Sequence, residues 1–461
     1  MRARFVSAML VVIGWALLLP AQSSPYNGSA TDAKPGGLSD QDSSGAKQLP
    51  AQVAGMAMHL SVKDAEAIAL KNNPAITVAR LTALASQQVV REVRSSLWPQ
   101  ANVNLTAVDA RDNSRITAGA LNNPIIYSRA AGGMSVNQLI TDFGHTTNLI
   151  ASARLQAKAE EQNSAATKED VLLAVDQAFY NALQTRAVLR VAEQTVASRQ
   201  LLSDQVSALT KSKLKSDLDL SFANVNLAQA KLLYLDALNN DKSAMASLSA
   251  ILGYPTLENF DLVNDTEPLA VPPADVDQLI ADAFARRPEV LALEFETESA
   301  EKFRQARRDE ILPTISASAA YGDSPVRDDR VYGPYGAAGV NLQIPVFDGF
   351  LYQSRSRESE LRAQAARQRL ADLRNHISRD VRTAWLTAST AYDRVHVSEQ
   401  LMAQANLALD LAQTRYRLGL SSIVELSQAQ LQQTQAEIGN AQADSEYRLA
   451  LSVLRYQTGS L

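Results

Sequence analysis

Residues 383–418 read TAWLTASTAYDRVHVSEQLMAQANLALDLAQTRYRL and contain neither proline nor glycine. They end a longer stretch, residues 352–418, in which both residue types are absent, and residues 148–212 form a second such stretch. An α-helix rises about 1.5 Å per residue, so a continuous helix of about 65 residues would be on the order of 100 Å long. The sequence therefore predicts helices far longer than those of an ordinary globular domain.

A second helical segment follows each long stretch after a short turn. These segments span residues 216–252 and 422–458, and each ends at a glycine, as a helix with a left-handed C-terminal cap does. Two helices joined by a short turn pack against each other as an antiparallel pair. The sequence thus predicts two long helical hairpins, at about residues 148–252 and 352–458.

The two hairpins belong to an internal duplication. Matching prolines and glycines keep separations of 205 to 214 residues: Pro74 with Pro288, Pro99 with Pro313, Gly144 with Gly349, and Gly253 with Gly459. Solenoid proteins repeat every ~20 to 50 residues, so a separation this long indicates two copies of a whole multi-element unit. We assign the first copy to residues 58–254, the second to residues 276–461, and a linker to residues 255–275.

The sequence also predicts a β-hairpin in each copy, between the short helices and the long ones. Helical patterning stops at Pro99 and at Pro313, and apolar residues then alternate with polar ones. The alternation spans about residues 100–141 in the first copy and 314–346 in the second, where we expect a loop at residues 322–335. The residues expected on the apolar face are Val103, Leu105, Ala107, Met134, Val136, Ile315, Ala317, Ala319, Tyr321, Ala338, Val340, Leu342 and Ile344.

Four strands with one apolar and one polar face are compatible with two environments. In a soluble sandwich, the polar face would meet water. If instead the apolar face meets lipid, every backbone polar group must be paired, and the sheet has to close with strands of other copies of the chain. Polar residues would then line a water-filled interior, and the helical hairpins would extend the tube on one side.

The N-terminal residues have the pattern of an export signal. Arg2 and Arg4 precede an apolar stretch that ends at Leu19, and small residues follow it. We therefore expect residues 1–23 to be a signal peptide. Residues 24–57 are rich in Ser, Gly, Gln, Pro and Asp, and we expect them to be a flexible tail.

Composition narrows the function classes further. The chain has no cysteine, which excludes disulfides and thiolate chemistry. Losing the two arginines of the signal lowers the formal net charge from -5 to -7, which argues against nucleic acid as a partner. The four histidines show no spacing typical of a metal site, and no phosphate-binding glycine loop or nucleophile motif appears. We expect no catalytic residues, no cofactor and no metal.

Several local signatures resemble the TolC family of outer-membrane efflux proteins, over about residues 58–461. They are ALKNNP at residues 69–74, FDG at residues 347–349 and, most specifically, RYRLGL at residues 415–420. The resemblance implies a mainly α, internally duplicated fold, in which three chains build one twelve-stranded β-barrel in the outer membrane and one coiled-coil helical tunnel through the periplasm. It implies a passive channel for efflux or type I secretion that docks on an inner-membrane transporter through a periplasmic adaptor.

The resemblance also places the residues that close the tunnel at the tip of the second hairpin. In the family a tyrosine precedes the tip glycine, a basic residue follows that glycine by two places, and acidic residues follow it by six and nine. These positions here hold Tyr416, Gly419, Ser421, Glu425 and Gln428. The basic residue and one of the two acidic residues are therefore missing, and the chain does not retain the family's full salt-bridge network.

Glu425 has two interpretations. Three symmetry-related copies would form a carboxylate ring across a narrow bore, which favours cations, and replacing Glu425 with Gln would then alter cation selectivity. Alternatively, Glu425 is a first-turn carboxylate that complements the N-terminus of the helix beginning near Ser422. Asp219 holds the corresponding place in the first copy and has the same helix-end alternative.

Both hairpin tips are candidate contacts for the adaptor. In the first tip Lys213 replaces the glycine, and a solvated basic turn explains its lysines equally well. The candidate residues are Lys211, Lys213, Lys215, Leu420, Ser421 and Ser422.

A rival interpretation from another class is a periplasmic or surface coiled-coil structural protein without channel activity. The strands distinguish the two, because a scaffold has no reason to carry lipid-compatible alternation between its helices in both copies. No motif identifies the exported substrate.

Overall fold

A computed structural model describes residues 58–111, 127–258, 260–263, 269–327, 329 and 333–461. The expected signal peptide and flexible tail, residues 1–23 and 24–57, lie outside the described residues.

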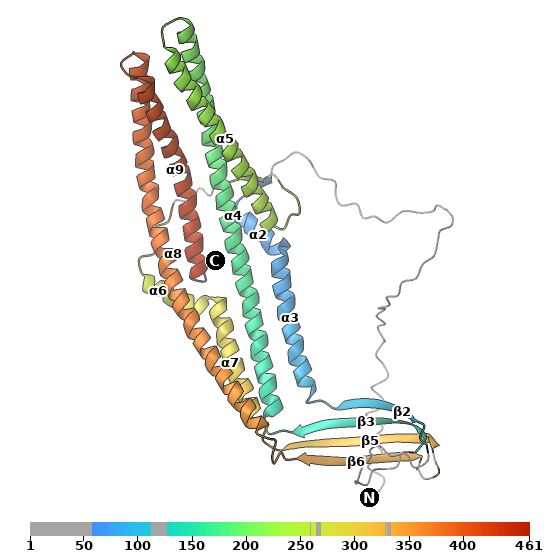
Figure 1. Ribbon diagram of the computed structural model, residues 1–461. Helices are drawn as coiled ribbons and strands as arrows, with labels where there is room; N and C mark the ends of the chain where they lie inside the picture. The colour runs from blue at the N-terminus through green and yellow to red at the C-terminus, as the bar shows by residue number, and fades with distance from the viewer. Residues whose placement is uncertain (1–57, 112–126, 259, 264–268, 328, 330–332) are drawn as a thin grey trace, which may run out of the picture. The chain divides into compact units, whose positions relative to one another are not determined.

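The described elements occur in the same order in both copies (Figure 1). In the first copy they are β1 (Met58–Leu60), α2 (Val62–Asn72), α3 (Pro74–Ser95), β2 (Gln100–Val108), β3 (Arg129–Thr141), α4 (His145–Lys211) and α5 (Asp217–Ile251). In the linker and the second copy they are β4 (Phe260–Leu262), α6 (Val276–Arg286), α7 (Pro288–Asp309), β5 (Thr314–Arg327), β6 (Pro334–Gln343), α8 (Leu351–Arg417) and α9 (Ile423–Gln457).

Corresponding helices have equal lengths in the two copies. The short helices have 11 residues in α2 and α6, and 22 residues in α3 and α7. The long helices have 67 residues in α4 and α8, and 35 residues in α5 and α9. The internal duplication is therefore preserved at the level of whole elements, and α4 begins three residues earlier than the sequence predicted.

The boundaries between the short helices follow from proline. Pro74 and Pro288 are the first residues of α3 and α7, where proline lacks an N–H that the helix would leave unpaired anyway. The preceding residues, Asn73 and Arg287, are extended, which ends the helices before them. The Asn73 side chain also accepts a hydrogen bond from the backbone N–H of Ala75.

Each 35-residue helix ends at a glycine that packs against the break between the short helices. Gly253 has φ 85° and Gly459 has φ 67°, in the left-handed region that glycine tolerates. A Cβ atom on Gly253 would lie 2.9 Å from the backbone oxygen of Asn72, and one on Gly459 would lie 3.0 Å from the backbone nitrogen of Arg287. Glycine is thus required both for the turn and for the close approach.

The four longer strands form one antiparallel sheet in the order β2-β3-β5-β6. Residues that face each other across neighbouring strands share a face of the sheet. Val103 pairs with Met134, which pairs with Tyr321, while Asn137 pairs with Ser318. The pairing therefore gathers the predicted apolar residues within the strands on one face and the Asn and Ser residues on the other.

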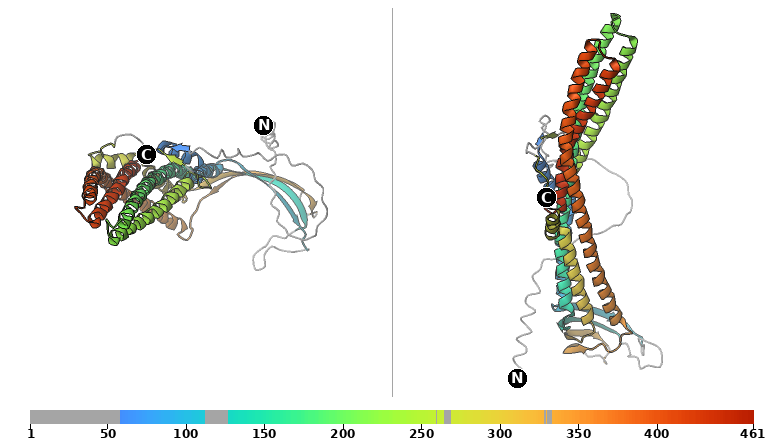
Figure 2. Two further views of the ribbon diagram at one scale, coloured as in Figure 1. Left: turned by 90° about the horizontal axis from the view of Figure 1, so that it is seen from above. Right: turned by 90° about the vertical axis from the view of Figure 1, so that its left-hand side faces the viewer.

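The apolar face is open in the single chain. Val103 is 73% exposed and Leu105 is 84% exposed, and Val340 and Leu342 of β6 are also mostly exposed. Figure 2 shows the four strands bowed into a curved sheet. Such a face has no covering layer among the described residues.

One expectation about the strands was wrong. Residues 322–335 were expected to form a loop, but β5 continues to Arg327 and β6 begins at Pro334. Two further strands were not predicted: β1 precedes α2, β4 lies within the linker, and the two pair in parallel. Both β1 and β4 have only three residues, which is too short for alternation to be recognised.

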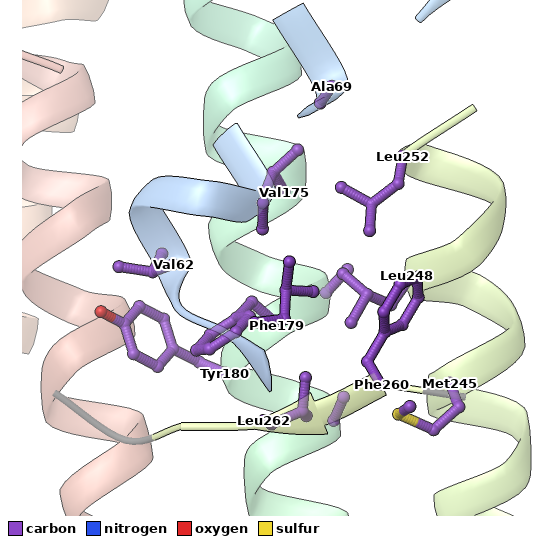
Figure 3. Close-up of a cluster of buried hydrophobic side chains, with 14 of the residues drawn as sticks. Val62, Ala69, Val175, Phe179, Tyr180, Met245, Leu248, Leu252, Phe260 and Leu262 are labelled. Carbon is purple, nitrogen blue, oxygen red and sulfur yellow. The ribbon is translucent and has the colours of Figure 1, made fainter. Parts of the chain in front are cut away.

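The small β1–β4 sheet covers a hydrophobic core where α2, α4 and α5 meet (Figure 3). Leu60, Phe179, Leu248 and Leu252 are almost completely buried there, and Phe260 and Leu262 of β4 complete the cluster. The second copy has a comparable core at α8 and α9, built around Tyr447.

The two copies pack on each other mainly through α4, which lies against both α7 and α9 of the second copy. Asn226 of α5 also donates a hydrogen bond to Ser427 of α9, at 2.7 Å. The two helical hairpins thus lie side by side in one chain (Figures 1 and 2). Within the described residues, no helix is both long enough and apolar enough to span a bilayer.

Candidate functional site

The candidate site comprises the tips of the two helical hairpins, at the ends of α4 and α8 farthest from the strands (Figure 1). The same turn is built twice. Lys213 has φ 58° and Gly419 has φ 73°, so both occupy the left-handed region at corresponding positions.

Backbone hydrogen bonds close both turns in the same way. Leu214 donates to the carbonyl of Leu209 at 2.9 Å, and Leu420 donates to that of Arg415 at 2.8 Å. Lys213 and Gly419 donate to the carbonyls three residues before them. This is the Schellman pattern, in which a left-handed residue satisfies the last carbonyls of the helix.

The returning helices begin with serine caps. Ser216 caps α5, and Asp219 accepts hydrogen bonds from both the backbone N–H and the hydroxyl of Ser216, at 3.2 and 2.9 Å. Ser422 caps α9 and accepts from the N–H of Glu425 at 3.4 Å. The geometry around Asp219 therefore matches the helix-end interpretation of that carboxylate.

Glu425 also has a cationic partner in its own chain. Its Oε1 lies 3.1 Å from Nε of Arg415, across the turn, and the two side chains are 46% and 56% exposed. Arg415 belongs to the RYRLGL signature, but its pairing with Glu425 was not predicted. The available signal was a symmetrical placement: Arg415 lies three residues before the C-cap Leu418, and Glu425 lies three residues after the N-cap Ser422.

Tyr416 connects the second tip to the first. Its side chain is 6% exposed and packs with Ile423, Leu426 and neighbouring apolar residues. Nζ of Lys215 lies 4.0 Å from the centre of the Tyr416 ring, the geometry of a cation–π contact. Burial raises the pKa of Tyr416, and the nearby charge of Asp219 raises it further.

The hydroxyl of Tyr416 is buried without a hydrogen-bond partner, and so is the hydroxyl of Ser421. Burying a hydroxyl that makes no hydrogen bond is unfavourable. Tyr416 therefore links the hairpins through its ring, which meets Lys215 and belongs to a cluster that packs against Leu202 of α4, while its hydroxyl contributes no hydrogen bond.

The other candidates lie at the surface of the tips. Lys211, Lys213, Gly419, Leu420, Ser422 and Gln428 are exposed, whereas Lys215, Asp219 and Ser421 are half-buried.

Exposed apolar side chains at both tips were missed by the sequence prediction, apart from Leu420. Leu214 and Leu218 project from the first tip, and Leu418 and Val424 from the second; all four are more than half exposed. Exposed apolar groups gathered in this way mark surfaces that bind other proteins. The helical pattern alone could not identify them, because apolar residues on a helix are normally expected in the core.

No group of three or more His, Asp or Glu side chains within the described residues is arranged to hold a metal ion.

Comparisons with known proteins agree with this architecture. A family profile described as "Outer membrane efflux protein" matches residues 67–254 and again residues 279–460. The outer membrane efflux protein BepC of Brucella suis is 24% identical over 342 residues, which cover 71% of this chain and 72% of BepC. TolC of Escherichia coli is 23% identical over 399 residues, covering 80% of this chain and 76% of TolC.

A solved structure shows the same fold. The crystal structure of the Campylobacter jejuni CmeC outer membrane channel superimposes with a TM-score of 0.75 at 15% identity, covering 96% of this chain and 94% of that one. The family profile covers most of the chain in two blocks, one in each copy, and the chain therefore belongs to the outer membrane efflux protein family.

Proposed function

We propose that three copies of this outer-membrane efflux protein close into a single tube, which conducts substrates passively through the periplasm and across the outer membrane. The observation that carries the proposal is the open apolar face of the four-stranded sheet. An apolar face of this extent is stable against lipid and unstable against water.

The edges of the sheet support closure by other copies. In the described residues β2 pairs only with β3, and β6 only with β5, so each outer strand has one side without a partner strand. Unpaired backbone groups are costly in lipid, and joining β6 of one copy to β2 of the next removes both edges. Three copies supply twelve strands, as the resemblance to the family implies.

The polar face would then line the bore. It carries Asn102, Asn104, Ser135, Asn137 and Asn341, which pair in register across the strands. Uncharged polar side chains of this kind suit a water-filled passage. These five side chains are uncharged, which suits a duct whose energy comes from an inner-membrane transporter.

The hairpin tips are the proposed docking surface for a periplasmic adaptor and the proposed gate. The exposed leucines would supply apolar contacts, and Lys211 and Lys213 would supply positive charge around them. Tyr416, Gly419, Glu425, Gln428 and Asp219 form the proposed gate at the second tip and its contact with the first.

A pair of neighbouring substitutions tests the proposal. Val340→Asp places a charge on the apolar face, and we expect it to hinder barrel insertion, since a charge that faces lipid is unfavourable in each of the copies. Asn341→Asp adds the same charge on the polar face and should be tolerated. The readouts are outer-membrane fractionation, oligomer mobility in SDS electrophoresis without heating, and conductance in planar bilayers.

Equal behaviour of the two variants, with a soluble monomer in both, would overturn the proposal and favour the structural coiled-coil alternative.

A further inference from the structure

A cavity of about 320 Å³ lies between the two helical hairpins of one chain. It is formed by α4 and α5 of the first copy and α9 of the second. Its lining residues are Thr195, Arg199, Asn226, Gln229, Ala230, Leu233, Ser427, Leu431 and Thr434.

Arg199 is the charged residue of this cavity and is 7% exposed. Its Nη2 donates one hydrogen bond, to Oγ1 of Thr434 at 3.4 Å. A guanidinium has five N–H donors and cannot lose its charge under ordinary conditions. Burial lowers the pKa of Arg199 to about 10, which still leaves the group cationic near neutral pH.

No carboxylate in the described residues forms an ion pair with Arg199. Glu437, one turn beyond Thr434 on α9, is near enough to favour the charged arginine electrostatically, but its carboxylate accepts a hydrogen bond from Gln433. No carboxylate of the described residues lies within ion-pair distance of Arg199, so its buried charge is only partly balanced and a further anion can pair with it directly.

The remaining lining matches an anion that has an apolar body. Asn226, Gln229, Ser427 and Thr434 offer neutral polar groups, and the cavity lining contains no acidic side chain to repel an anion. Leu233, Leu431 and Ala230 provide an apolar wall. The volume exceeds that of a single small ion and lies at the lower end of cavities that hold small organic ligands.

We propose that this cavity binds a small organic carboxylate, whose charged group pairs with Arg199 and whose apolar part packs against Leu233 and Leu431. Such a ligand touches both hairpins of one chain. Its binding would stabilise the arrangement of the hairpins seen here relative to any arrangement that separates them. The proposal does not depend on channel activity.

The test uses benzoate as probe and the full chain purified in detergent. Calorimetric titration and thermal denaturation should both detect benzoate binding. Arg199→Met, which keeps side-chain length and removes the charge, should raise the Kd for benzoate about tenfold or more. Arg190→Met is the matched control, since Arg190 is an exposed arginine of the same helix outside the cavity, and it should leave the Kd unchanged.

A second variant guards against misfolding of Arg199→Met. Gln229→Glu places a carboxylate in the cavity with little change of shape, so it should abolish benzoate binding and raise the melting temperature. Benzoate binding that is insensitive to both variants would overturn the site. An equal, Arg199-dependent response to inorganic phosphate at matched ionic strength would overturn the assignment to carboxylates with an apolar body.

Discussion

Lys213 and Gly419 occupy the same position in the two hairpin turns, and both have positive φ. This conformation costs a residue with a Cβ atom about 1–2 kcal/mol, whereas glycine adopts it freely. We expect Lys213→Gly to stabilise the chain by about 0.5–1 kcal/mol, because relief of strain outweighs the added freedom of the unfolded chain. Thermal or urea unfolding measures the change.

Gly419→Ala is the reciprocal control. A Cβ atom at Gly419 would meet nothing within 4 Å, so the substitution only strains the backbone. We expect it to lower the stability of the chain by about 1 kcal/mol. If Gly419→Ala raised the stability of the chain, or Lys213→Gly lowered it, these turns would have to change conformation in the assembled protein.

Two carboxyls near the core of the first copy contribute to the change of stability with pH. Burial raises the pKa of Glu66 to about 7, with the charge of Asp176 adding to it, and burial together with the charge of Glu289 raises that of Glu169 to about 7. Both groups therefore keep their protons in the folded chain where the unfolded chain, with a pKa near 4.5, has lost them. Stability should fall as pH rises from about 4.5 to 7 and then level off.

The double variant Glu66→Gln with Glu169→Gln should flatten this slope in melting temperature, because glutamine stays neutral throughout. Glu92→Gln on the exposed face of α3 should leave the slope as it is. A slope that persists in the double variant would assign the pH dependence to other groups.

At the scale of elements, the helices were predictable and the short strands were not. Absence of proline and glycine over residues 148–212 and 352–418 left no alternative to long helices, and the structure confirms them. The four longer strands were predictable because apolar and polar residues alternate over part of each of them. The three-residue strands β1 and β4 depend on a partner about 200 residues away, which no local pattern reveals.

The extension of β5 through Gly322 has a specific cause. Gly322 and Pro325 are residues that usually mark loops, but Gly322 pairs with both Gly133 and Tyr335. The Tyr335 side chain lies across both glycines, and a Cβ atom on either would collide with its hydroxyl. Glycine here makes room for an aromatic side chain, a tertiary effect that the sequence pattern could not indicate. Tyr335 thus lies on the polar face and Tyr321 on the apolar face.

The contact between the hairpin tips makes a prediction about Tyr416. Since its hydroxyl is buried without a hydrogen-bond partner, Tyr416→Phe should stabilise the chain by about 1–3 kcal/mol and leave bilayer conductance unchanged. Lys215→Met removes the cation above the ring and should cost about 0.5–1 kcal/mol and increase conductance through the tip.

If Tyr416→Phe instead opens the channel as much as Lys215→Met does, the hydroxyl must gain a partner in the assembled protein. The placement of Tyr416 at the hairpin tip could be predicted from the RYRLGL signature. Its contact with Lys215 could not, because that contact depends on how two separate hairpins are rotated against each other.

At the scale of the whole molecule, the ion pair of Arg415 with Glu425 modifies the expected carboxylate ring. In the proposed trimer, three arginines would accompany three glutamates, so their charges would largely cancel. Glu425→Gln should leave the arginines unbalanced and shift bilayer selectivity toward anions. Arg415→Gln should unmask the glutamates and shift it toward cations.

Reversal potentials across a salt gradient measure both shifts, which have opposite signs. Gln432→Asn, an exposed neutral change two turns farther along α9 and outside the proposed gate, serves as control. Unchanged selectivity in both charge variants would mean that the pair lies outside the bore and acts only at the helix ends.

The equal lengths of corresponding helices constrain how the length of the two helical hairpins can change in evolution. Each of α4 and α8 has 67 residues, so one extra turn in either of them alone would displace one tip by about 5 Å while the other stayed in place. The returning helix of the same hairpin would also have to grow, and so would both helices of the other copy. Lengthening or shortening the hairpins evenly therefore requires matched insertions or deletions at four distant points of one gene. Point mutations alone do not change the length of the hairpins.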